Sequence, residues 1–198
     1  MPGLIWPLLL FAVVVVVSPG ANNLLAASSG LRFGLRASLG LLAGLGLGVI
    51  SVVVLAAAGL GAVVTSVPQA QTGLRTVGTA YLLWLAVQIA RSGRPESTKA
   101  SRTPRGFAAG LLVSWLNPKV WVLGITAVAG YSAVSSNPLI LSAVLGGVFA
   151  AVVAPNLVLW CGCGQTIATK LTTDRQWHVA NLILAALLVM SITLMWAD

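Results

Sequence analysis

Apolar residues fill six long stretches of this chain, and short polar segments separate them. A helix needs about 20 apolar residues to cross the hydrocarbon core of a bilayer, and each stretch reaches or approaches that length. The pattern therefore predicts an all-α, polytopic membrane protein with six transmembrane helices in a single transmembrane domain over residues 1–198. The predicted spans cover about 4–30, 38–65, 73–90, 106–131, 138–163 and 177–197.

Two of these stretches, the first and the fourth, are interrupted near their middle. Ser18 precedes Pro19 and Gly20 in the first, and Asn117 precedes Pro118 in the fourth. Serine and asparagine are good helix N-caps and proline suits the first helical position, so we expect new half-helices to begin at Pro19 and Pro118. A helix that starts inside a membrane leaves polar backbone groups there, which is tolerated only in a cavity or a protein interior. A pair of such breaks indicates the binding site of a transporter.

A polar linker at about 91–105 divides the chain into two halves. Repeat one covers about 4–90 and repeat two about 106–197, with three predicted spans in each. Three is an odd number, so related halves must have opposite orientations in the membrane. Both breaks fall near the bilayer centre at a rise of 1.5 Å per residue. We therefore predict two inverted three-helix repeats with broken helices one and four.

Composition supports the membrane assignment. The chain is 58% hydrophobic and 7% charged, and its mean hydropathy is +0.99, which excludes a soluble domain of 198 residues. The net charge of +8 does not indicate a nucleic-acid partner, because the basic residues concentrate after spans one, three and five. These residues are Arg32, Arg36, Arg91, Arg94, Lys99, Arg102, Arg105, Lys170 and Arg175. The positive-inside rule then places these loops in the cytoplasm and both termini outside, with membrane lipids as neighbours.

Lys119 is the most informative charged residue, because it lies in the middle of predicted span four. The three acidic residues lie in loops or at the terminus: Glu96, Asp174 and Asp198. An intramembrane charge indicates a functional site. We hypothesise that Lys119 binds a substrate carboxylate, helped by the positive ends of the two half-helices. The alternative is a structural lysine that donates to carbonyl groups exposed by the break.

Three asparagines lie at the same predicted depth, namely Asn22, Asn23 and Asn117. An amide both donates and accepts, which suits the amine and polar side chain of a small zwitterion. Alternatively, these amides satisfy backbone groups freed by the breaks. The candidate substrate-binding residues are Pro19, Gly20, Asn22, Asn23, Asn117, Pro118 and Lys119. We expect no cofactor and no enzymatic activity. We also expect no metal, since the predicted spans lack the carboxylates that hard cations require.

Two further patterns leave alternatives open. Cys161 and Cys163 suggest a membrane thiol-redox conductor, but their spacing fits neither a redox pair nor a zinc site, and small packing residues explain them better. Gly40, Gly44 and Gly48 form a smooth helix face, which indicates close packing within the bundle or a contact in a homo-oligomer. A non-catalytic membrane subunit is another alternative function.

Several motifs together resemble the lysine exporter (LysE/RhtB) superfamily over nearly the whole chain. They are residues 19–23 (PGANN), 29–34 (SGLRFG), 78–85 (GTAYLLWL) and 115–121 (WLNPKVW). The resemblance implies a secondary transporter in the bacterial inner membrane that exports small neutral or polar amino acids. The Asn-Asn pair and the motif around Lys119 look most like the cysteine/O-acetylserine branch, with threonine or homoserine as the other type of substrate. The family usually has a second proline where this chain has Ala21.

Overall fold

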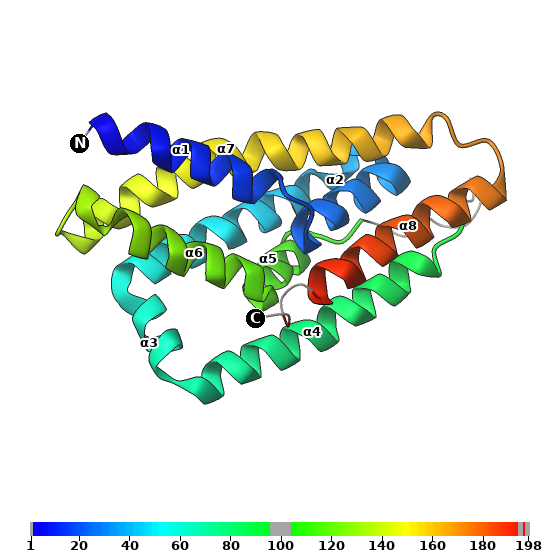
Figure 1. Cartoon of the computed structure of the whole chain (residues 1–198). Helices are drawn as coiled ribbons and strands as arrows, with labels where there is room; N and C mark the ends of the chain where they lie inside the picture. The colour runs from blue at the N-terminus through cyan, green and yellow to red at the C-terminus, as the bar shows by residue number, and fades with distance from the viewer. Residues whose placement is uncertain (1, 96–103, 194–195, 197–198) are drawn as a thin grey trace.

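The computed structural model describes residues 2–95, 104–193 and 196, and these residues form helices and connections without a strand. An all-α fold is therefore confirmed. A π-helical turn, Ala56–Leu60, joins α2 to α3, and a 3-10 turn, Ser132–Val134, follows α6. Figure 1 shows the helices in order. They are α1 (Pro2–Val17), α2 (Ala21–Leu55), α3 (Gly61–Ser66), α4 (Pro68–Ala90), α5 (Phe107–Leu116), α6 (Pro118–Tyr131), α7 (Pro138–Ala168) and α8 (Asp174–Thr193).

Three helical segments of the described chain are long and apolar enough to cross a membrane: Ala21–Ser66, Pro138–Ala168 and Asp174–Thr193. A fourth span results if the bent pair Phe107–Leu116 and Pro118–Val134 counts as one, and this pair is bent by 66°. The fold is thus that of a multi-pass membrane protein. The six-span, inverted-repeat arrangement stays a prediction.

A reversal inside α2 separates the first two predicted spans. Gly34 has φ 75° and ψ 171°, a conformation that glycine adopts without strain. The hydroxyls of Ser29 and Ser38 lie 2.7 Å apart, although nine residues of straight helix would separate them by about 13 Å. α2 is therefore two antiparallel halves, and Figure 1 shows the blue half and the cyan half side by side. This turn falls between the predicted spans 4–30 and 38–65.

α2 is the central helix, and it packs most extensively against α7 and α5. Glycines allow this close approach. A Cβ atom on Gly44 would overlap the carbonyl oxygen of Phe107, and one on Gly48 would lie 2.5 Å from Ser114 Cβ. Gly40 has more room, with its nearest atom, Phe107 N, 3.8 Å from a built Cβ. The prediction that this stripe packs inside the bundle is confirmed for Gly44 and Gly48.

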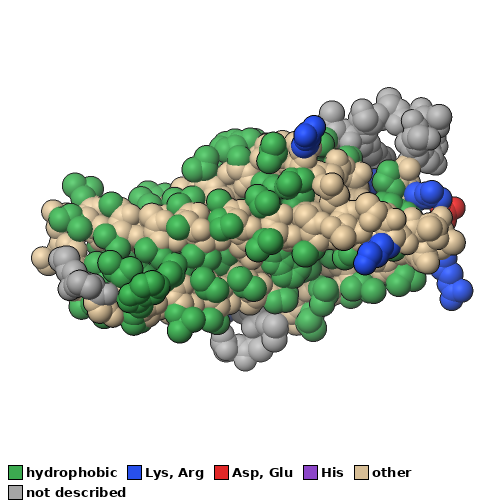
Figure 2. All heavy atoms as spheres, turned by 90° about the horizontal axis from the view of Figure 1, so that it is seen from above, with side chains coloured by type: hydrophobic (Ala, Val, Ile, Leu, Met, Phe, Trp, Pro, Cys, Tyr) green, Lys and Arg blue, Asp and Glu red, His purple; other side chains and the backbone are tan. Residues whose placement is uncertain are grey.

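Three basic connections meet at one end of the molecule. Arg94 Nη1 donates to Thr172 O, and Asn181 Nδ2 donates to Ser92 O, so the end of α4 lies against the α7–α8 connection. The backbone N–H of Leu35 donates to Gln165 Oε1, which brings the Gly34 turn to the same end. Figure 2 shows Lys and Arg side chains gathered toward this end, with hydrophobic side chains over the rest of that face.

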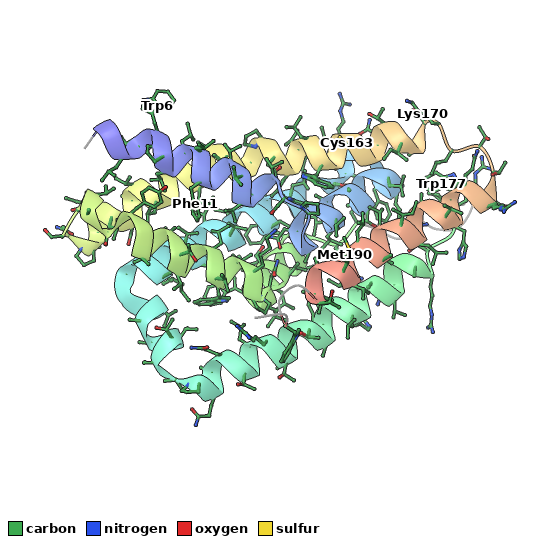
Figure 3. The ribbon with its side chains drawn as sticks, in the orientation of Figure 1. Trp6, Phe11, Cys163, Lys170, Trp177 and Met190 are labelled. Carbon is green, nitrogen blue, oxygen red and sulfur yellow. The ribbon has the colours of Figure 1, made fainter. Side chains whose placement is uncertain are left out.

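We call this region the basic end. Its existence agrees with the charge pattern of the sequence, although Lys99 and Arg102 lie outside the described residues. Lys170 marks the basic end in Figure 3, and Trp6 points outward near the opposite end. The cytoplasmic position of the basic end and the external position of the termini stay predictions.

Candidate functional site

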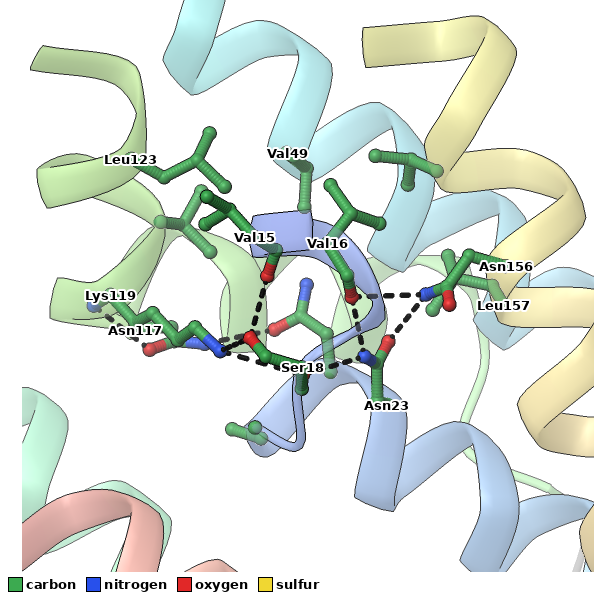
Figure 4. A pocket seen from close by; sticks show the side chains of 15 residues that line it. Val15, Val16, Ser18, Asn23, Val49, Asn117, Lys119, Leu123, Asn156 and Leu157 are labelled. Carbon is green, nitrogen blue, oxygen red and sulfur yellow. Dashed lines mark hydrogen bonds between the residues drawn. The ribbon is translucent and has the colours of Figure 1, made fainter. Parts of the chain in front are cut away.

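The two helix breaks, about a hundred residues apart in sequence, are in direct contact. Residues 18–20 lie between α1 and α2, and Asn117 lies between α5 and α6. Lys119 Nζ donates to Ser18 Oγ at 2.7 Å, and Asn117 Nδ2 donates to Asn22 Oδ1 at 3.1 Å. Figure 4 shows these bonds among the side chains that line a cavity. The structure therefore brings together the residues that the two sequence motifs singled out separately.

The second break has the local structure that the sequence predicts. α6 begins at Pro118, and the side chain of Asn117 accepts a hydrogen bond from the Lys119 backbone N–H at 3.1 Å. Asn117 is thus a helix N-cap, which confirms that prediction. Because its Oδ1 is used in the cap, its Nδ2 is left to bind Asn22 across the bundle.

The first break differs from the prediction. α2 begins at Ala21 after an N-cap, Gly20, that forms no side-chain capping bond, so the prediction that Ser18 caps a half-helix starting at Pro19 is wrong. Gly20 is fully extended, with φ −174° and ψ 174°, and this separates the Ser18 hydroxyl from the first turn of α2. The hydroxyl donates instead to Val15 O at 2.7 Å, at the end of α1. Ala21 occupies the first helical position, where proline is favoured but not required.

Lys119 is half-buried, and its ammonium group is held by the exposed backbone of the first break. Besides the Ser18 hydroxyl, it donates to Pro19 O at 3.2 Å and to Ser18 O at 3.4 Å. The one ion pair among the described residues joins Arg94 to Asp174 at 3.9 Å, at the basic end. Neutral oxygens therefore surround the Lys119 charge in this structure. This geometry fits the alternative in which Lys119 is a structural lysine that donates to carbonyl groups exposed by the break. It also leaves an ammonium group that an anion can approach.

Asn23 ties the first break together and has a partner that sequence reasoning missed. Its Nδ2 donates to Val16 O at 2.7 Å and to Ser18 O at 3.1 Å, two carbonyls that the break leaves without helical donors. Its Oδ1 accepts from Asn156 Nδ2 of α7 at 2.8 Å. Asn156 is 5% exposed. The signal available in the sequence was an asparagine directly after Pro155, inside a predicted span.

Ser114 is a second residue that the sequence analysis did not select. Its hydroxyl accepts from Asn22 Nδ2 at 2.8 Å and donates to Leu45 O of the second half of α2 at 2.9 Å. A continuous chain of hydrogen bonds thus runs from Leu45 through Ser114 and Asn22 to Asn117. The asparagines form hydrogen bonds with the backbone at the breaks and with one another. This agrees with the alternative in which the amides satisfy backbone groups freed by the breaks, and the asparagines also line the cavity.

The cavity has a volume of about 40 Å³ and combines apolar walls with polar groups. This is room for about three water molecules. Five of the seven predicted site residues line it: Gly20, Asn22, Asn23, Asn117 and Lys119. Pro19 does not line the cavity but supplies a carbonyl oxygen to Lys119, while Pro118 lies against Gly78 of α4. The apolar walls include Val49, Val120, Leu123, Val153 and Leu157.

We expect replacement of Asn156 by leucine to destabilise the protein. The change leaves Asn23 Oδ1, a buried acceptor, without its donor, at a cost of about 1–3 kcal/mol. Thermal unfolding of the purified protein in detergent checks this, with Gln69→Leu, at an exposed amide of α4, as the matched control. Equal melting temperatures for the two variants would show that the Asn23–Asn156 bond contributes nothing.

The two cysteines lie on α7 in different surroundings. Cys161 is fully buried and its backbone packs against Gly30, whereas Cys163 is exposed. Residues two apart on a helix point to nearly opposite sides, so these thiols do not face each other. Packing explains Cys161 but not Cys163. Among the residues that the structure describes, no three His, Cys, Asp or Glu side chains cluster to hold a metal ion.

Comparison with known proteins agrees with the motifs. The model of the LysE type translocator family matches residues 13–195. A cysteine/O-acetylserine efflux protein of Klebsiella pneumoniae is 36% identical over 190 residues, covering 95% of this chain and 94% of that protein. An uncharacterized membrane protein of Vibrio cholerae is 31% identical over 196 residues, covering 81% and 94%.

A cysteine/O-acetylserine efflux protein of Salmonella paratyphi A is 34% identical over 121 residues, covering 61% of this chain and 62% of that protein. No solved structure gives a significant match. The family model spans nearly the whole chain and includes both helix breaks, which confirms the resemblance drawn from the motifs. The chain therefore belongs to the LysE type translocator family.

Proposed function

We propose that this protein is a secondary transporter that exports small neutral or polar amino acids from the bacterial cytoplasm. Membership of a translocator family supports transport, and the Klebsiella relative, 36% identical, is named a cysteine/O-acetylserine efflux protein. Among amino acids, we place cysteine and O-acetylserine ahead of threonine and homoserine, because the efflux-named relatives carry the former name.

The observation that carries the proposal is the ammonium group of Lys119 at the junction of two broken helices. Its partners are the neutral oxygens of Ser18 and Pro19, which a substrate carboxylate can replace with a gain in Coulomb energy. α6 begins at Pro118, beside Lys119, and the positive end of its helix dipole favours an anion there. Lys119 thus binds the carboxylate, while Asn22, Asn23 and Asn117 take the amine and polar side chain.

Transport requires the site to open, because the present cavity holds only about three water molecules. We propose six spans in two inverted three-helix repeats, and rocking of one repeat against the other exposes the site to each side in turn. The bonds Lys119–Ser18 and Asn117–Asn22 cross from one proposed repeat to the other. They are the contacts that part as the repeats separate, and substrate binding compensates for their loss.

An efflux assay tests the function directly. Cells that produce the protein are loaded with labelled cysteine, O-acetylserine, threonine, homoserine or lysine, and the rate of release is compared with that of non-producing cells. We expect faster release of cysteine and O-acetylserine, and no change for lysine. Equal release of every amino acid, with the protein folded in the membrane, would contradict the proposal and favour a non-catalytic membrane subunit.

The cysteines provide a test against the thiol-redox alternative. A redox conductor needs two thiols that pair and cycle, whereas a transporter does not. We expect the double variant Cys161→Ala, Cys163→Ser to retain export within about twofold, since Cys163 is exposed and alanine keeps Cys161 apolar. Complete loss of activity in a stably folded double variant would instead support a redox role.

A further inference from the structure

A second cavity, of about 390 Å³, lies near the basic end of the molecule, and none of its described lining residues lines the site around Lys119. We call it the basic cavity. Its polar lining comes from α2, from the end of α4 and the segment after it, and from the segment before α5. It includes Ser28, Ser29, Arg32, Gln88, Ser92 and Arg105. Its volume falls within the range of about 300–1,000 Å³ that is typical of small-molecule sites.

The two guanidinium groups of the basic cavity come from distant parts of the chain and are held by neighbours. Arg105 Nη2 donates to Gln88 Oε1 at 2.7 Å, and its guanidinium lies 5.0 Å from the centre of the Trp84 ring. Arg32 lies 5.8 Å from the centre of the Phe33 ring. Among the residues that the structure describes, those that line the basic cavity include no acidic side chain. Held guanidinium groups with serine hydroxyls beside them suit a carboxylate, which they bind with two parallel hydrogen bonds.

The basic cavity and the Lys119 site lie along one face of α2. Asn22 lines the site, and Leu25, Ser29 and Arg32 line the basic cavity. Residues at i, i+3, i+7 and i+10 share one side of a helix. At 1.5 Å per residue, Asn22 and Ser29 lie only about 10 Å apart along this face. Leu25, which is apolar, lies between Asn22 and Ser29 on this face of the helix.

We propose that the basic cavity is the entry vestibule of the transporter, where Arg32 and Arg105 bind the carboxylate of a small amino acid before it moves along α2 to Lys119. This inference rests on the proposed export function and on the predicted cytoplasmic position of the basic end. It assigns the first recognition step to the two guanidinium groups and the central binding step to the ammonium group. An anionic lipid headgroup in the same cavity is the competing occupant that the experiment must exclude.

The test is exchange of labelled cysteine, kept reduced, in inside-out membrane vesicles that contain unlabelled cysteine, because their outer face is the cytoplasmic one. We expect Arg32→Gln and Arg105→Gln each to raise the apparent KM for cysteine about tenfold, the cost of losing one charged hydrogen-bonding partner. The maximal rate stays within about twofold, since Lys119 is intact. Arg36→Gln, at an exposed arginine of the same end, is the matched control and leaves the KM unchanged.

A second measurement separates carboxylate recognition from general damage. Cysteamine is cysteine without its carboxylate, so its inhibition constant for cysteine exchange should be the same in the wild type and in both arginine variants. An unchanged cysteine KM in the variants, or an equal rise for cysteine and cysteamine, would overturn the vestibule. A KM effect that disappears in liposomes of neutral phosphatidylcholine would assign the cavity to a lipid. A wild type without exchange would overturn the proposed function, and the vestibule with it.

Discussion

Lys119→Met should reduce amino-acid export by roughly a hundredfold or more, the effect of removing one partner from a buried, hydrogen-bonded charge pair. The proposed substrate carboxylate then enters a half-buried site without its counter-charge. The other polar groups around it, among them Asn22 and Asn117, are neutral. Methionine has nearly the length of the lysine stem, so the packing of that stem is largely kept. The loss should therefore appear in transport and not in the amount of folded protein.

The efflux assay checks this prediction with two companion variants. Lys170→Met removes an exposed lysine from the basic end and should export like the wild type. Lys119→Arg keeps the charge but changes the shape of the donor, and it should restore part of the activity. Normal export by a well-produced Lys119→Met protein would assign Lys119 to the structural alternative, in which it only satisfies the carbonyls of residues 18 and 19.

The second large effect is expected at the contact between α2 and α5. A Cβ atom on Gly44 would overlap the carbonyl oxygen of Phe107 and would lie 3.0 Å from the backbone nitrogen of Leu111. Both neighbours are backbone atoms, so α5 as a whole must move before alanine fits. We expect Gly44→Ala to destabilise the protein by roughly 3 kcal/mol, near the upper end of overpacking costs. α5 leads into Asn117, so export should fall as well.

Gly40→Ala is the matched control for this prediction. It adds the same methyl group one turn away on the same stripe, where the nearest atom, Phe107 N, is 3.8 Å from the built Cβ. The melting temperature in detergent and the monodispersity of the purified protein are the measurements. If Gly44→Ala melts at the same temperature as Gly40→Ala, the close approach of α2 and α5 does not contribute to stability.

The sequence predicted those features of the site that depend on local rules. Asn117 and Pro118 form a cap and a first helical residue whatever surrounds them, so the second break was recognisable from a few residues. The first break does not follow these rules: Ser18 does not cap α2, because the extended Gly20 separates the two. The Ser18 hydroxyl accepts from Lys119, a partner from the other half of the chain that local rules do not include.

The missed residues share a different cause. Asn156 and Ser114 matter because of partners more than 90 residues away, namely Asn23 and Asn22. Pairings of this kind depend on how α7 and α5 pack against α2, and a single sequence does not record that packing. The reversal at Gly34 was easier to anticipate, since the polar and basic residues around it end one apolar stretch before the next begins.

The central claim is that Lys119 holds the carboxylate of the transported amino acid where the two broken helices meet. The chain has only three lysines, Lys99, Lys119 and Lys170, so labelling every lysine Nζ with ¹⁵N gives a simple solid-state NMR spectrum. The measurement is dipolar coupling to cysteine labelled with ¹³C at its carboxylate, in reconstituted protein, with Lys119→Met to assign the signal. We predict coupling to Lys119 that corresponds to a distance of about 4 Å or less. Bound cysteine without coupling to Lys119 would contradict the account.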